Sequence, residues 1–86
     1  MDINQLIANI KKKIENEIEL ESIKIEDKSF LHKNHAQNQV GKFHLKIYIK
    51  SPDLKKLTKI EGNKKIYKIL EIELKEFIHS VQILIT

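Results

Sequence analysis

Four histidines are the residues of this chain whose side chains most readily take part in chemistry. Neutral imidazole binds iron, zinc and copper, and its ordinary pKa of about 6.5 suits proton transfer near neutral pH. The histidines are scattered through the sequence as His32, His35, His44 and His79. The spacing His32-x-x-His35 is by itself a weak metal signal, and histidines in polar loops are usually just solvated. A metal role therefore depends on whether the fold brings these residues together.

Other reactive groups are few. The chain has no cysteine, which excludes a disulfide framework, a thiolate zinc site, a cysteine nucleophile and an iron–sulfur protein that supplies all of its own ligands. A histidine with Asp27 or Glu26 could support acid–base chemistry, but Ser29 does not lie in a nucleophile elbow and no other motif places a nucleophile. The only glycines, Gly41 and Gly62, form no phosphate-binding loop. We expect a protein that is not an enzyme.

The length and composition predict one folded domain over residues 1–86. The chain has 86 residues, of which 41% are hydrophobic and 33% are charged, and such a length accommodates a single domain. No apolar run approaches the ~18 residues of a membrane span. The acidic and polar start of the chain is unlike a signal or transit peptide. We therefore expect a cytoplasmic protein.

Two hydrophobic periods predict the elements of the first half. A capping box formed by Asp2 and Gln5 precedes apolar residues at helical spacing, which predicts a helix over 3–16. An alternating pattern predicts a strand over 20–27. Residues 28–41 have no periodic pattern, and 14 residues is long for a hairpin loop.

The second half of the chain begins with a strand over 43–50, in which apolar and polar residues alternate strictly. Its polar face carries His44, Lys46 and Tyr48. We expect Gly62 to interrupt the segment that follows the short helix described next, and Asn63 to cap the longer helix after it. The remaining expected elements are a short helix over 52–58, a helix over 64–77 and a strand over 79–85.

The order αββ(α)αβ predicts an α/β fold of the α+β sandwich type. The strand–helix–strand unit at the end of the chain should be a right-handed crossover, which makes the strands 43–50 and 79–85 parallel. The strand 20–27 should pair antiparallel with the strand 43–50, giving a three-stranded mixed sheet with helices on one face. Parallel strands begin at the same end of a sheet, so His44, His79 and the loop with His32 and His35 should gather at one edge.

The charge favours an anionic partner only weakly. All 16 basic residues are lysine, and the formal net charge is +4. Arginine, which reads guanine and clamps phosphates, is absent. A candidate phosphate-binding segment at a predicted helix N-terminus consists of Gly62, Asn63, Lys64 and Lys65. It resembles the nucleotide-binding loop of KH domains but lacks the second glycine of that loop. The alternative is a solvated lysine face.

Several short motifs, in order, resemble the BolA-like family over about residues 3–85. The family has the αββ(α)αβ fold, which is class II KH-like, in agreement with the order above. The matching segments are Asp27-Lys28-Ser29, Phe43-His44-Leu45, Ile66-Tyr67 and Ile78-His79-Ser80-Val81.

The resemblance implies a partner of monothiol glutaredoxins. The two proteins would share a bridging [2Fe–2S] cluster, for which the glutaredoxin side supplies a cysteine and a glutathione thiolate. On this side the resemblance implies His79 as one ligand and His35 as the second, with His32 as the alternative. His44 and Tyr67 would face the partner. Alone, the protein should be a monomer without a cofactor.

The resemblance also implies a competing function, a KH-like transcription regulator that binds DNA. The family segment tied to nucleic acid reads Asn63-Lys64-Lys65 here, so its arginines and histidine are missing.

Overall fold

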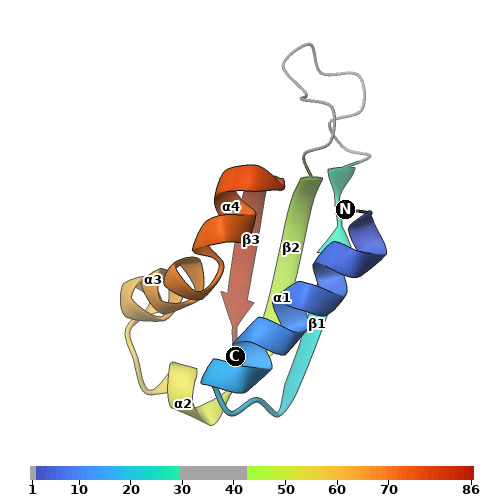
Figure 1. The fold of residues 1–86 in the computed structure, drawn as a ribbon. Coiled ribbons are helices and arrows are strands. Elements are labelled where there is room, and N and C mark those ends of the chain that lie inside the picture. The colour runs from blue at the N-terminus through green and yellow to red at the C-terminus, as the bar shows by residue number, and fades with distance from the viewer. Residues whose placement is uncertain (1, 30–42) are drawn as a thin grey trace.

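The computed structural model describes residues 2–29 and 43–86 (Figure 1). The chain order is helix, two strands, three helices and a final strand, where the sequence predicted two helices before the final strand. The elements are α1 (Ile3–Glu17), β1 (Ser22–Asp27), β2 (Phe43–Lys50), α2 (Pro52–Lys55), α3 (Lys59–Ile69), α4 (Glu71–Glu76) and β3 (Ile78–Ile85).

The first helix begins where the sequence predicts. The carboxylate of Asp2 accepts a hydrogen bond from the Gln5 backbone N–H at 2.8 Å, and the Gln5 side chain accepts one from the Asp2 N–H at 3.2 Å. These two bonds satisfy amides that have no partner within the helix. One face of α1 is fully buried through Leu6, Ile10 and Ile14.

The sheet confirms the predicted topology. Its strand order is β1-β2-β3, so β2 is central. β1 pairs antiparallel with β2, and β2 pairs parallel with β3, with Ile47 opposite both Ile25 and Ile83. The parallel pair arises because α2, α3 and α4 carry the chain back along one face of the sheet before β3 begins.

The core lies between the sheet and its helices, all of which cover one face (Figure 1). Alternate residues of β2 point into it, and Leu45, Ile47 and Ile49 are buried there. Ile66 and Leu70 complete the core from α3 and its C-terminal cap. The opposite face of the sheet has no helix over it within the described residues. Among these residues, none of the helices is long and apolar enough to cross a membrane.

The third helix differs from the expectation at its start. It begins at Lys59, not at residue 64, because Thr58 caps it: the Thr58 hydroxyl accepts from the Glu61 N–H and the Glu61 carboxylate from the Thr58 N–H, both at 3.1 Å. Gly62 therefore lies inside the helix, with its N–H donating to the Thr58 carbonyl at 2.9 Å. The prediction that Gly62 ends the preceding segment and that Asn63 caps the next helix was wrong.

Two other boundaries also differ. The short helix α2 ends at Lys55 rather than at 58, and the predicted helix 64–77 is interrupted at Leu70. The backbone of Leu70, with φ −98° and ψ 18°, leaves the helical region and separates α3 from α4. The interruption redirects the chain toward the start of β3.

Candidate functional site

The candidate site lies where β2 and β3 begin, and an irregularity in their pairing creates it. Phe43 pairs with Ile78 and His44 pairs with Ser80, so His79 is an extra residue without a partner in β2. Such a β-bulge re-aims side chains. Ile78 stays in the core with 3% of its surface exposed, while both His79 and Ser80 are exposed.

The bulge brings two of the four histidines together. The ring centroids of His44 and His79 are 4.9 Å apart, and the ring planes are tilted by 57°. His44 Nδ1 and Ser80 Oγ are 2.6 Å apart and share a hydrogen bond. The imidazole of His44 is therefore held at a defined place, and the exposed imidazole of His79 lies against it.

The end of β1 closes over the backbone of His44. The Asp27 carboxylate accepts a hydrogen bond from the Ser29 N–H at 2.9 Å, which shapes a tight turn. In that turn the Ser29 hydroxyl accepts from the His44 N–H at 3.1 Å, and the Lys28 N–H donates to the His44 carbonyl at 2.7 Å. The segment Asp27–Ser29 thus satisfies both backbone groups of His44.

The predicted convergence is confirmed for His44 and His79. The other two histidines, His32 and His35, lie outside the described residues. His44 is only 5% exposed, which corrects the expectation that it faces a partner as a surface residue. The Asp27–Ser29 turn covers the backbone of His44, and the hydrogen bond to Ser80 holds the His44 ring. Tyr67, the other residue expected to face a partner, is 43% exposed on α3.

Ser80 was not recognised as a site residue from the sequence. The alternation of β3 places Ser80 on the same face as His44 once the two strands are parallel neighbours, and this signal could have identified it. The serine hydroxyl at this position makes the hydrogen bond with His44 Nδ1.

The open face of the sheet next to the site carries charge around one aromatic ring. The ammonium groups of Lys46 and Lys24 lie 5.1 and 5.8 Å from the ring centroid of Tyr48. A hydrogen bond from the side chain of Tyr48 lowers the pKa of Glu26, and Lys28, whose ammonium is 3.4 Å away, adds to the effect. Glu26, Lys28 and Tyr48 thus form a small polar network beside the turn that covers His44.

The alternative nucleic-acid set is not at a helix N-terminus. Gly62, Asn63, Lys64 and Lys65 lie within α3, and the Gly62 amide is already bonded to Thr58. The Asn63 side-chain amide donates to the Lys59 carbonyl at 2.8 Å. Free backbone amides for phosphate, which the prediction required, are therefore not offered by this segment, although Lys64 and Lys65 are exposed.

The described residues by themselves do not form a metal site. Within residues 2–29 and 43–86, no group of three or more His, Cys, Asp or Glu side chains could hold a metal ion. His79 and His44 form a pair, of which only His79 is exposed. A metal group bound here would need further ligands from elsewhere.

Comparison with known proteins identifies the family and agrees with the fold. The family model described as "BolA-like protein" matches residues 14–86. This chain belongs to the BolA-like family. A relative in Haemophilus influenzae, named as the DNA-binding transcriptional regulator BolA, is 33% identical, and the match covers 94% of this chain and 73% of the relative. That name describes the relative as a DNA-binding regulator of transcription.

Solved structures of BolA domains have the same fold. The BolA domain of SufE1 from Arabidopsis thaliana matches with a TM-score of 0.78 and 25% identity, over 92% of this chain and 87% of that chain. BolA1 from the same plant matches with a TM-score of 0.76 and 23% identity over the same shares. The expected α/β fold is thereby confirmed.

Proposed function

We propose that this BolA-like protein is a non-enzymatic accessory protein that binds a monothiol glutaredoxin. The two would co-ligate a bridging [2Fe–2S] cluster in iron–sulfur trafficking or in iron or redox regulation. The observation that supports this most is the exposed imidazole of His79, which the β3 bulge turns outward beside His44.

The chemistry of His79 fits a cluster ligand. Among the described residues its ring makes no hydrogen bond or ion pair, and its one ring contact is with His44. Neutral imidazole replaces thiolate at one iron of Rieske clusters, where it raises the reduction potential. The chain has no thiol, so the thiolates would come from the cysteine and the glutathione of the glutaredoxin side. His35, or alternatively His32, would complete the ligands from this chain.

The neighbours of His79 have supporting roles in this proposal. His44 is a positioning residue, because its ring limits where the His79 ring can lie. Ser80 fixes the His44 ring, and the turn at Asp27–Ser29 fixes the His44 backbone. His79 therefore binds from a rigid strand, which reduces the conformational entropy lost when a partner arrives.

The test is to mix the protein with a cluster-loaded monothiol glutaredoxin and record visible absorbance and circular dichroism. A new mixed-ligand spectrum is expected, and His79→Ala should abolish it without changing the far-ultraviolet spectrum of the fold. His35→Ala should weaken or alter the spectrum, and His32→Ala should change it little. Gln82→Ala, an exposed change on the same strand, is the control. An unchanged spectrum with His79→Ala contradicts the proposal.

The second candidate function is a transcription regulator that binds DNA. It is favoured by the name of the Haemophilus influenzae relative and by the 16 lysines of the chain. Binding through lysine–phosphate contacts must weaken steeply as salt rises, since counterions are released from the DNA. A gel-shift assay at several salt concentrations tests this function, and absence of any shift at low salt contradicts it.

A further inference from the structure

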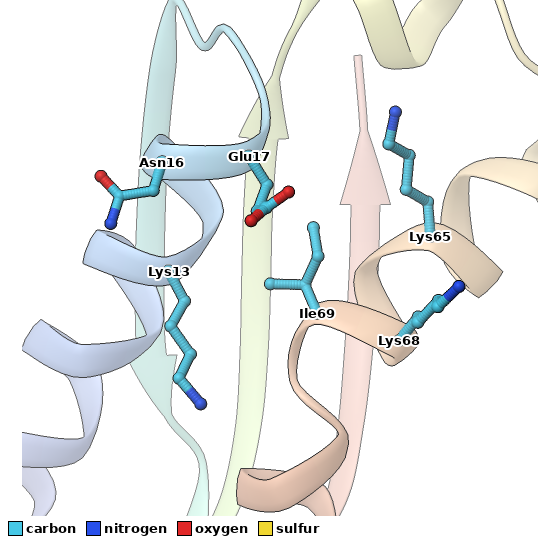
Figure 2. A pocket seen from close by; sticks show the side chains of 6 residues that line it. All are labelled: Lys13, Asn16, Glu17, Lys65, Lys68 and Ile69. Atoms are coloured by element: carbon cyan, nitrogen blue, oxygen red, sulfur yellow. The ribbon is translucent and has the colours of Figure 1, made fainter.

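A cavity of about 540 Å³ lies between α1 and α3, on the helical side of the molecule. Its volume falls within the roughly 300–1,000 Å³ of typical small-molecule sites. Six side chains line it: Lys13, Asn16 and Glu17 from α1, and Lys65, Lys68 and Ile69 from α3. Figure 2 shows Glu17 and Ile69 pointing into the gap from opposite walls, with Lys65 and Lys68 extending from α3.

The spacing within each helix explains why these residues share one gap. Positions i, i+3 and i+4 lie on the same face of a helix. Residues 13, 16 and 17 have this spacing on α1, and residues 65, 68 and 69 have it on α3. The cavity is therefore built by two facing stripes on well-formed helices and not by a loop.

The charges of the cavity are only partly neutralised by the protein. Lys13 is paired with the buried carboxylate of Glu73, with 2.6 Å between its Nζ and Oε2. The ammonium of Lys13 keeps further N–H donors for a ligand but adds little net charge. Lys65 and Lys68 make no ion pair with any described residue, and neither does Glu17. Two unpaired ammonium groups thus lie on one wall and a single unpaired carboxylate on the other, and Figure 2 shows both lysine side chains directed away from Glu17.

We propose that this cavity binds a small ligand with clustered phosphate groups. Lys65 and Lys68 turn their flexible side chains toward the phosphates, and Lys13 adds a donor from a fixed position. Ile69 provides an apolar wall for any uncharged part of the ligand. Glu17 is the one lining group that opposes an anion, so it sets an upper limit on affinity.

This site is separate from the histidine site. The Ser51 hydroxyl, just after β2, donates to the Glu19 carbonyl at 2.8 Å, so the C-terminal end of α1 lies where β2 ends. His44 and His79 lie at the opposite end, where β2 and β3 begin (Figure 1). The inference is therefore independent of the proposed glutaredoxin function.

The experiment is a titration of the full chain with inorganic triphosphate, ATP and adenosine, followed by amide and side-chain NMR at low salt. Triphosphate and ATP should shift the signals of the lining residues, and adenosine alone should not. Equal affinity for triphosphate and ATP would assign recognition to the phosphates, and tighter ATP binding would add a contact of the nucleoside with Ile69. Both results support the site.

Two variants make the test specific. Lys65→Gln with Lys68→Gln should weaken triphosphate binding by about tenfold or more, since charge-assisted hydrogen bonds are lost. Glu17→Gln should strengthen it by a few-fold, because the opposing charge is removed. Lys55→Gln with Lys56→Gln removes the same charge from exposed positions outside the cavity and is the control.

Three results would overturn the proposal. The first is the absence of any triphosphate binding at low salt. The second is an equal loss of affinity in the Lys55/Lys56 control, which would mean attraction by net charge alone. The third is a response of these lysines to a DNA duplex but not to triphosphate or ATP, which would support the DNA-binding function instead.

Discussion

His79 is exposed because β3 contains one residue more than β2 at the start of their pairing. Without the bulge, alternation would place residues 79 and 80 on opposite faces of the sheet. With it, both are exposed while Ile78 remains in the core. At the scale of single residues, the site therefore depends on the bulged residue His79 and on the hydroxyl of Ser80, which bonds to His44.

Ser80→Ala should lower the free energy of unfolding by about 1 kcal/mol, since the bond between Ser80 Oγ and His44 Nδ1 is lost. Chemical denaturation measures the change. Gln82→Ala, which removes an exposed side chain from the same strand, should change stability by less than about 0.5 kcal/mol. Equal effects of the two variants would mean that the hydrogen bond contributes nothing to folding.

Tyr48→Phe should raise the pKa of Glu26 toward its ordinary value of 4.5, because the hydrogen bond from Tyr48 is the largest cause of the lowering. A lowered pKa in the folded state gives stability that is present above the unfolded pKa and is lost as pH falls through the folded pKa. The variant should therefore lose less stability on acidification. NMR titration of the Glu26 carboxyl measures the pKa; an unchanged value would assign the lowering to Lys28 and Lys24.

The pair of Lys13 and Glu73 should respond differently to the loss of each partner. The Glu73 side chain is 7% exposed, and its Oε1 has no hydrogen-bond partner among the described residues. Lys13→Met should destabilise by about 1–3 kcal/mol, because it leaves a buried carboxylate without a counter-charge. Glu73→Leu removes that carboxylate and leaves a half-exposed lysine, so it should be neutral or stabilising. Thermal unfolding of both variants measures their stabilities, and a Glu73→Leu variant less stable than Lys13→Met would contradict the prediction.

At the scale of elements, α3 illustrates how one glycine can be a packing residue and not a helix end. Gly62 lies in the second turn, and a Cβ built there would be 2.9 Å from Ile85 Cδ1. Glycine costs a helix interior about 1 kcal/mol relative to alanine. Gly62 therefore lowers the intrinsic stability of α3, but its lack of a Cβ lets the Ile85 side chain of β3 pack close to the helix.

A double-mutant cycle can separate these two effects. Gly62→Ala alone should change stability by no more than about 1 kcal/mol, since better helix propensity is offset by the contact with Ile85. Ile85→Val removes the contacting methyl, so the double variant should be more stable than the sum of the single changes predicts. Urea denaturation of the four proteins measures the coupling. Simple additivity would mean that the Ile85 side chain rotates away freely.

At the scale of the whole molecule, the two candidate sites lie at opposite ends of the sheet. One is formed by the starts of β2 and β3, and the other by the C-terminal half of α1 with α3. Mutations far apart and without shared partners act independently as a rule. The two proposed binding events should therefore be uncoupled.

This independence can be measured with the variants already described. His79→Ala should leave triphosphate affinity unchanged, and the Lys65/Lys68 double variant should leave the spectrum with a loaded glutaredoxin unchanged. Titration calorimetry and visible circular dichroism are the two readouts. A change in either cross-experiment would indicate that the helices transmit an effect between the ends of the sheet.

The sequence by itself determined the element types and the parallel pairing of β2 with β3. Hydrophobic periodicity is a local property, and a strand–helix–strand crossover permits few arrangements. It also contained the true start of α3, because Thr58 and Glu61 have the spacing of a capping box. The prediction relied instead on Gly62 as a helix breaker, whereas its lack of a Cβ leaves room for the Ile85 side chain of β3, a long-range contact that local sequence does not reveal.

Only the tertiary structure decided the form of the histidine site. Alternation predicts that His44 is on the polar face, but its burial depends on the Asp27–Ser29 turn that bonds to its backbone and on Ser80 from β3. The bulge at His79 likewise exists only in the register between two strands. These contacts join residues 15 to 36 positions apart, and local periodicity carries no information about pairing at such a distance.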